Sequence, residues 1–217
     1  RGQMTPDPIL KVCGITRLVD ALHALQQGAT ALGFVFWERS PRKIDPGQAK
    51  AIIAALPKGT TAVAVFVNES VEQVQEVVKV TGVKVVQLHG DETAGDFNRL
   101  DCPLFRSVTL DDLVDTARGW PAETTFLLDA NDRVRRGGTG KAIDWDRAAV
   151  AARHHRLVLA GGLTPLNVEE AIRRVRPYGV DVSSGVESSP GIKDFEKVSA
   201  FLANARRGFA ALRVETL

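Results

Sequence analysis

The sequence is poor in the residues that stabilise small secreted proteins. Only two of its 217 residues are cysteines, Cys13 and Cys102. A chain of this length buries a full core without covalent cross-links, so one arithmetically possible disulfide does not indicate a disulfide scaffold. Neither cysteine has a Cys or His at the spacing of a metal-binding motif, and we therefore expect no metal site.

The chain also lacks an excess of charge and a long hydrophobic run. Lys and Arg number 28 against 26 Asp and Glu, a net charge of +2, which is too balanced for a protein that coats nucleic acid or an anionic membrane. No apolar run approaches the roughly 18 residues that span a bilayer, and the first residues lack the apolar core of a secretory signal. We expect a cytoplasmic protein with neither a nucleic-acid nor a membrane partner.

No linker or low-complexity tract divides the chain, and many α/β folds of this length are single domains. We expect one barrel domain over residues 9–207. Residues 1–8 are expected to form an N-terminal extension, disordered in part or vector-derived, and residues 208–217 a C-terminal tail.

Short apolar runs alternate with longer amphipathic segments along the whole chain. Several of the runs are continuous stretches of Val, Leu, Ile, Phe and Ala, as at residues 62–67, which is typical of strands buried on both faces of a parallel sheet. The expected strands are Ile9–Ile15, Ala31–Trp37, Thr61–Val67, Val83–His89, Leu104–Leu110, Thr125–Ala130, Arg156–Gly162 and Gly179–Gly185.

Signals for helix starts lie between these runs. Asp45 followed by Pro46 is an N-cap with proline at the first helical position, and Ser70 begins a capping box that ends at Gln73. Thr16 is expected to cap a helix that closes at Gly28, and Asp144 and Thr164-Pro165 are each expected to open one. Another helix is expected after Asp111, and the last is expected to run from Lys193 onward.

Eight strands in strict alternation with helices predict an α/β fold with a parallel sheet. Repeats of about 25 residues favour a single (β/α)₈ barrel with outer helices. An open doubly wound sheet is the alternative, but the Gly-x-Gly-x-x-Gly motif expected after its first strand is absent.

Reactive residues fall near the carboxyl ends of the expected strands, where barrel enzymes place their active sites. Cys13 and Asp129 close the first and sixth strands, Arg42 follows the second, and His89 ends the fourth. Each has a structural alternative. Cys13 could be a small buried hydrophobe and Asp129 a helix cap or a partner of an arginine. Arg42 could be a surface residue, and His89 is as compatible with packing as with a site.

Two glycine-rich turns follow the last two strands, Gly161-Gly162 and Ser183-Ser184-Gly185. Glycine lets the backbone approach a ligand closely, and helix N-termini attract anions. The corresponding loops of (β/α)₈ barrels often hold phosphate. These turns therefore predict a phosphate site, the alternative being that the glycines only make tight turns.

A third glycine-rich stretch, Gly137–Lys141, lacks the spacing of a nucleotide-binding P-loop and follows no strand directly. We expect a mobile loop over the active site there.

Six motifs occur in order from the first strand to the last helix, and together they resemble phosphoribosylanthranilate isomerase of tryptophan biosynthesis. They are Lys11-Val12-Cys13-Gly14-Ile15-Thr16, Ser40-Pro41-Arg42, Gln87-Leu88-His89-Gly90, Gly137-Gly138-Thr139-Gly140-Lys141, Leu159-Ala160-Gly161-Gly162-Leu163 and Asp181-Val182-Ser183-Ser184-Gly185-Val186-Glu187.

The resemblance implies a barrel that carries out an Amadori rearrangement, converting N-(5-phosphoribosyl)anthranilate to 1-(2-carboxyphenylamino)-1-deoxyribulose 5-phosphate. It implies no cofactor, a small-molecule substrate as partner, and a monomer or homodimer. By resemblance Cys13 is the general base, Asp129 the general acid, and Arg42 holds the anthranilate carboxylate. The remaining substrate-binding residues implied are His89, Asp181 and, in the phosphate turns, Gly161, Gly162, Ser183, Ser184 and Gly185.

The residue types suit this chemistry. An acid must protonate the furanose oxygen, and a base must then take the C2 proton. A thiol is a poor base until a positive group lowers its pKa, which leaves Lys11 or a helix N-terminus as candidates. Other activities stay open: the aminoaldose isomerase of histidine biosynthesis or a dual-substrate form, indoleglycerol-phosphate synthase, and a non-catalytic phosphosugar-binding barrel.

Overall fold

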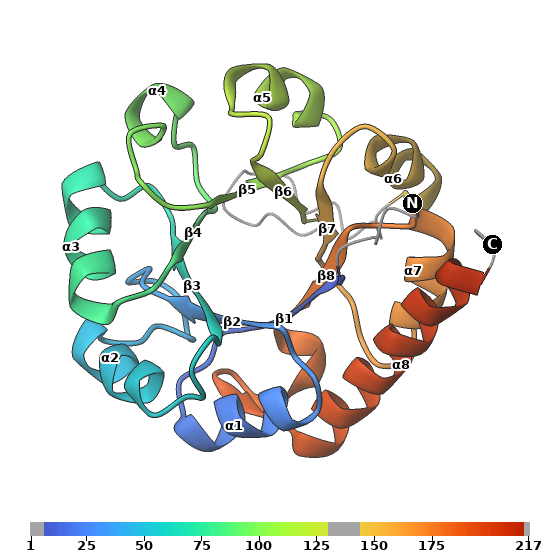
Figure 1. Ribbon diagram of the computed structural model, residues 1–217, viewed down its shortest axis with the longest axis horizontal. Coiled ribbons are helices and arrows are strands. Elements are labelled where there is room, and N and C mark those ends of the chain that lie inside the picture. The colour runs from blue at the N-terminus through green and yellow to red at the C-terminus, as the bar shows by residue number, and fades with distance from the viewer. Residues whose placement is uncertain (1–6, 130–143, 215–217) are drawn as a thin grey trace.

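The computed structural model, which describes residues 7–129 and 144–214, contains a closed ring of eight parallel strands. The ring closes where the last strand pairs with the first, and Figure 1 shows it end-on inside a circle of helices. The open-sheet alternative is therefore wrong, and the (β/α)₈ barrel is confirmed. The strands are β1 (Ile9–Cys13), β2 (Ala31–Val35), β3 (Thr61–Phe66), β4 (Val85–Leu88), β5 (Leu104–Val108), β6 (Thr125–Leu128), β7 (Leu157–Leu159) and β8 (Gly179–Val182).

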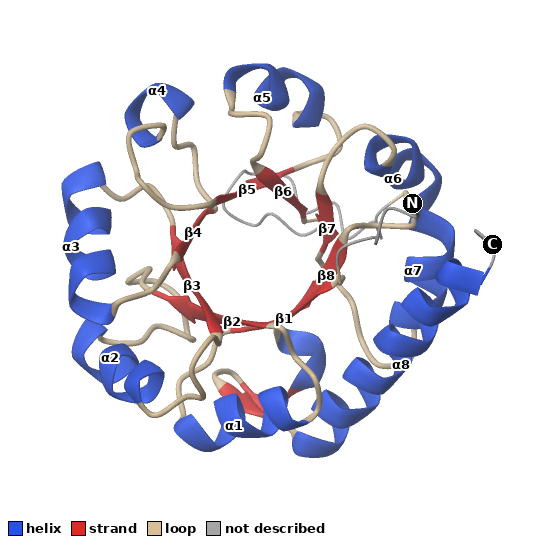
Figure 2. Ribbon diagram, in the orientation of Figure 1, coloured by secondary structure: helices blue, strands red, loops and turns tan. Residues whose placement is uncertain are grey.

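A helix follows each strand and covers the outside of the ring (Figure 2). Within residues 7–129 and 144–214, no helix is both long and apolar enough to cross a membrane. The helices are α1 (Leu18–Gln26), α2 (Pro46–Ala54), α3 (Val71–Thr81), α4 (Ala94–Phe97), α5 (Leu113–Gly119), α6 (Trp145–Ala152), α7 (Val168–Val175) and α8 (Phe195–Val214).

Side chains of each strand alternate between the barrel interior and the layer beneath the helices. On β1, Leu10 and Val12 belong to the large outer core, whereas Cys13 packs inside the ring. One end of the interior is filled by an apolar layer of Ala31, Val63, Val85 and Phe105. Buried polar side chains, Lys11, Gln87, Ser107 and Asp181, lie further along the strands. The interior is thus apolar at one end and polar toward the carboxyl ends.

The predicted helix starts at Asp45, Ser70 and Asp144 are confirmed. Asp45 accepts hydrogen bonds from the backbone amides two and three residues on, as does Asp144, and Ser70 accepts one from Gln73. The prediction for Thr16 is wrong, because its hydroxyl donates to the carbonyl of Gly191 and the N-cap of α1 is Arg17.

A short antiparallel hairpin, β9 (Glu187–Ser189) and β10 (Ile192–Lys193), intervenes between β8 and α8. The expected start of the last helix at Lys193 is therefore wrong, since α8 begins at Phe195. The domain boundaries stay a prediction: β1 begins at Ile9 as expected, and α8 continues past residue 207 to Val214.

Candidate active site

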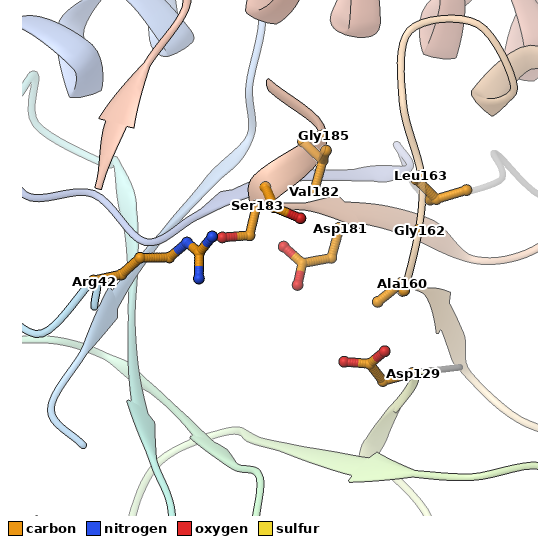
Figure 3. Close-up of a pocket in the computed structure, with 11 residues that line it drawn as sticks. Arg42, Asp129, Ala160, Gly162, Leu163, Asp181, Val182, Ser183 and Gly185 are labelled. Atoms are coloured by element: carbon orange, nitrogen blue, oxygen red, sulfur yellow. The ribbon is translucent and has the colours of Figure 1, made fainter. Parts of the chain in front are cut away.

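A cavity of about 330 Å³ lies at the carboxyl ends of β6, β7 and β8. The carboxylates of Asp129 and Asp181 face it from one side, and Arg42 extends toward Ser183 on the other (Figure 3). The structure therefore brings together residues predicted from four separate segments of the sequence. The lining consists of Arg42, Asp129, Ala160, Gly161, Gly162, Leu163, Asp181, Val182, Ser183, Ser184 and Gly185. The Gly137–Lys141 loop lies outside the described residues.

The first glycine turn requires glycine. Gly161 and Gly162 have φ angles of +74° and +73°, in the left-handed region that other residues rarely adopt. The Asn167 side-chain amide donates to the Gly162 carbonyl at 3.0 Å and fixes the turn. The predicted start of the next helix at Thr164-Pro165 is wrong, because α7 begins only at Val168.

The second glycine turn does open a helix, although a short one. Ser184–Val186 forms a single 3₁₀ turn that begins directly after Ser183. A Cβ at Gly185 would overlap the carbonyl oxygen of Leu163. The two turns thus pack against each other, and glycine is needed for that contact.

Arg42 is not the solvated surface residue that the sequence left as an alternative. Its Nε and Nη2 donate to both carboxylate oxygens of Glu187, with Nη2 to Oε2 at 2.7 Å and Nε to Oε1 at 2.9 Å. The Glu187 side chain is only 5% exposed. In the sequence, Glu187 is only the last residue of a motif, and nothing there indicates this role.

Lys193 is a second residue at this site whose role the sequence does not indicate. It is buried, and its Nζ donates to Glu187 Oε1 at 2.9 Å, to the Cys13 carbonyl at 2.6 Å and to the Ser183 carbonyl at 3.3 Å. Burial raises the pKa of the Glu187 carboxyl, but the Arg42 hydrogen bonds and the Lys193 charge outweigh it and hold that pKa below its usual range. The hairpin thereby ties β1, β8 and Arg42 together.

Cys13 lies inside the ring, beside Val35, Val65 and Trp37, and outside the lining of the cavity. A Cβ on Gly33 of the neighbouring strand would come within 2.6 Å of its sulfur, so glycine there makes room for the thiol. Burial raises the pKa of the Cys13 thiol above its ordinary value, and Lys11 opposes that rise. Cys13 and Cys102 are both free thiols.

Asp129 and His89 come together at the rim. Asp129 Oδ2 lies 3.6 Å from His89 Nε2, and His89 Nδ1 lies 3.2 Å from the side-chain nitrogen of Gln87. Because an amide nitrogen donates, His89 Nδ1 is the acceptor of the hydrogen bond from Gln87. His89 itself does not line the cavity. In the described part of the chain, no three His, Cys, Asp or Glu side chains gather as metal ligands would.

The comparison with known proteins decides the family. Residues 10–204 match the family model described as N-(5'phosphoribosyl)anthranilate (PRA) isomerase. The chain belongs to this PRA isomerase family. The match runs from β1 into α8 and so includes all the barrel strands.

Individual PRA isomerases agree over nearly the whole chain. The N-(5'-phosphoribosyl)anthranilate isomerase of Trichlorobacter lovleyi is 50% identical over 204 residues, covering 91% of this chain and 97% of its own. The crystal structure of the Thermotoga maritima enzyme superposes with a TM-score of 0.85 at 38% identity, covering 93% of this chain and all of its own. A further PRA isomerase was solved in complex with reduced 1-(o-carboxyphenylamino)-1-deoxyribulose 5-phosphate. It superposes with a TM-score of 0.82 at 37% identity, covering 93% of this chain and all of its own. The histidine-pathway alternative gains no support from these relatives.

Proposed function

We propose that this chain isomerises N-(5-phosphoribosyl)anthranilate to 1-(2-carboxyphenylamino)-1-deoxyribulose 5-phosphate in tryptophan biosynthesis. The observation that carries the proposal is the composition of one cavity. Two glycine turns suited to phosphate, the carboxyl of Asp129 and the guanidinium of Arg42 all line it. The relatives named above supply the substrate.

Asp129 acts first, as the general acid. It protonates the furanose oxygen while the nitrogen lone pair forms a C1=N bond, and the ring C1–O bond breaks. Cys13, as thiolate, then removes the proton from C2. The C2–H electron pair forms a C1=C2 bond and neutralises the iminium nitrogen. The resulting enol loses its O2 proton and gains a proton at C1, which gives the aminoketose.

Binding holds the sugar between acid and base. Backbone amides at Gly162, Ser184 and Gly185 would receive the phosphate, as amide donors at tight turns do. Arg42 would receive the anthranilate carboxylate. Gripping both ends of the substrate fixes the reacting carbons, which lowers the entropic part of the barrier.

The geometry of Arg42 determines how it meets that carboxylate. Its hydrogen bonds within the described residues run from Nε and Nη2 to Glu187. The edge formed by Nη1 and Nη2 is left for the substrate, so binding is end-on rather than through the Nε side.

The proposal is tested by incubating the protein with freshly made phosphoribosylanthranilate. Turnover is measured as the loss of the substrate's fluorescence. We expect turnover by the wild type and its loss in Cys13→Ala. The histidine-pathway aminoaldose is the control substrate, and turnover of that compound alone would overturn the proposal.

The oligomeric state of the active enzyme is a separate proposal. The relative from Thermotoga maritima is described as dimeric, and a structure of generated monomers of it is also known. A monomer or a homodimer in the cytoplasm is our prediction for this chain, and sedimentation equilibrium measures which it is.

A further inference from the structure

Two opposite charges are buried inside the barrel, and one of them, Asp181, also lines the cavity. Lys11 Nζ donates to Asp181 Oδ1 at 3.0 Å, and their side chains are 0% and 8% exposed. Lys11 and Asp181 are register partners on the paired first and last strands. Because β1 and β8 are neighbours in the closed ring, the ion pair spans the seam of the barrel.

Lys11 is also aligned with Cys13. The two residues are separated by one position on β1, so their side chains point to the same side of the sheet. Burial raises the pKa of the Cys13 thiol, and the charge of Lys11 lowers it. The lysine therefore lies between a carboxylate and a thiol.

The other charges around Cys13 come from three further segments. Lys193 reaches the Cys13 carbonyl from the hairpin, and Asp181 faces the thiol from β8. Arg42, from the loop after β2, interacts with it more weakly. Of these charges, Lys11 opposes the effect of burial on the thiol most strongly, and Lys193 less, whereas Asp181 reinforces it.

A buried ammonium needs its own counter-charge. Burial lowers the pKa of Lys11, but Asp181 and the Cys13 thiol raise it by more, so the lysine stays charged. An ammonium that is already paired and held in place can stabilise a developing thiolate without reorganising.

We propose that Lys11 is the counter-charge of the Cys13 thiolate and that Asp181 holds Lys11 in position for it. Both are positioning residues for the base, and the inference rests on the proposed role of Cys13. The same ion pair could instead only fasten β1 to β8. A fastening role predicts a loss of stability with no change in the titration of the thiol.

The test measures the Cys13 thiol directly, without substrate. The rate of alkylation by iodoacetamide is followed against pH in a Cys102→Ser background, where Cys13 is the only thiol. Lys11→Met keeps the length of the side chain and removes its charge. Lys11→Arg keeps a charge, and the double variant Lys11→Met with Asp181→Asn removes the whole pair without leaving a buried charge unpaired.

We expect the thiol pKa in Lys11→Met to rise by about 1–3 units, the usual effect of losing an opposite charge at this range. The thiol pKa should rise by less in the double variant, because Asp181 also disfavours the thiolate. In Lys11→Arg, the thiol pKa should lie closer to the wild-type value than in Lys11→Met. The acid limb of the pH profile of kcat/KM should move in the same direction.

An unchanged alkylation pKa in the double variant, with native circular dichroism, would overturn the proposal. The double variant decides the question if Lys11→Met alone fails to fold. Failure of the proposed role of Cys13 as the base is a separate outcome. It would appear as near-normal turnover in Cys13→Ala, whatever the alkylation data show.

Discussion

Glu187 accepts hydrogen bonds from Nε and Nη2 of Arg42, at 2.9 Å to one carboxylate oxygen and 2.7 Å to the other. The two residues are 145 positions apart in the chain. Glu187 is itself held by Lys193, so the orientation of the guanidinium is fixed from the hairpin and not from the loop that carries Arg42. If Arg42 binds the substrate carboxylate as proposed, this recognition depends on Glu187, a residue that does not line the cavity.

Removal of Arg42 should mainly weaken substrate binding. We expect Arg42→Ala to raise KM by the equivalent of about 2–4 kcal/mol, since a charge-assisted pair with the carboxylate is lost. Steady-state kinetics with the substrate and with an analogue lacking the carboxylate measure this. Equal losses for both compounds would show that Arg42 does not bind the carboxylate.

Glu187→Gln should raise KM in the same direction as Arg42→Ala but by less. The guanidinium is still present in this variant, although it is no longer held by an ionised partner. Combining the two substitutions should add little to Arg42→Ala alone, because Glu187 acts through Arg42. Fully additive effects in this double-mutant cycle would contradict the positioning role.

Removing either the general acid or the general base should lower kcat strongly. We expect Asp129→Asn and Cys13→Ser to lower kcat by on the order of 10²-fold or more, the usual contribution of a positioned acid or base. Cys102→Ser is the matched control for the cysteine and should leave kcat unchanged. Near-normal kcat in Asp129→Asn would rule out its role as the acid.

Gly162→Val should abolish the part of substrate affinity that depends on phosphate. A β-branched residue is strained at a φ of +73° and would displace the amide from the turn. Gly82 caps α3 at the same φ, with open space around it, so Gly82→Val reproduces the strain away from the cavity. Inhibition by inorganic phosphate in both variants measures the effect, and equal phosphate affinity in the two would contradict the assignment.

Stability should depend on the ionisation of Glu187. Its pKa is lower in the folded protein than in the unfolded chain, so its stabilising contribution is fully present above the unfolded value of about 4.3. It is lost as the pH falls through the lower folded value. Urea unfolding of the wild type and Glu187→Gln should give free energies that converge as the pH is lowered from 7 to 3. A difference independent of pH would show that charge is not involved.

Chelation should not affect the activity. The proposed rearrangement consists of proton transfers, which side chains alone can carry out. We expect equal kcat/KM with and without EDTA. An activity lost to EDTA and restored by a divalent ion would instead indicate a metal-dependent sugar-phosphate isomerase.

The sequence alone predicts the barrel because the local patterns repeat. Continuous apolar runs identify strands buried on both faces, and Asp45 and Ser70 fix helix starts through bonds to their nearest neighbours. The positions of Asp129, Arg42 and the glycine turns then follow from the rule that barrel sites lie at the carboxyl ends of strands. These features depend on a few consecutive residues or on the fold as a whole.

Partnerships between distant segments could not be predicted in this way. The residues next to Lys193 do not indicate that it contacts Cys13 and Glu187. The same local sequence is equally typical of a residue that precedes a helix. The cap predicted at Thr16 is wrong for the same reason, because the partner of its hydroxyl, Gly191, lies far along the chain. One signal was available: Lys11 and Asp181 each interrupt an apolar run, and a buried charge requires a partner.

The seam between β1 and β8 has a consequence for how the enzyme is made. Lys11 and Asp181 are 170 residues apart, and Lys193 lies 180 residues beyond Cys13. The first strand leaves the ribosome carrying Cys13, but Asp181 and Lys193 are among the last parts of the barrel to be synthesised. A nascent or truncated chain that ends before β8 lacks Asp181 and Lys193, so the set of charges around Cys13 is complete only when the whole ring has been made.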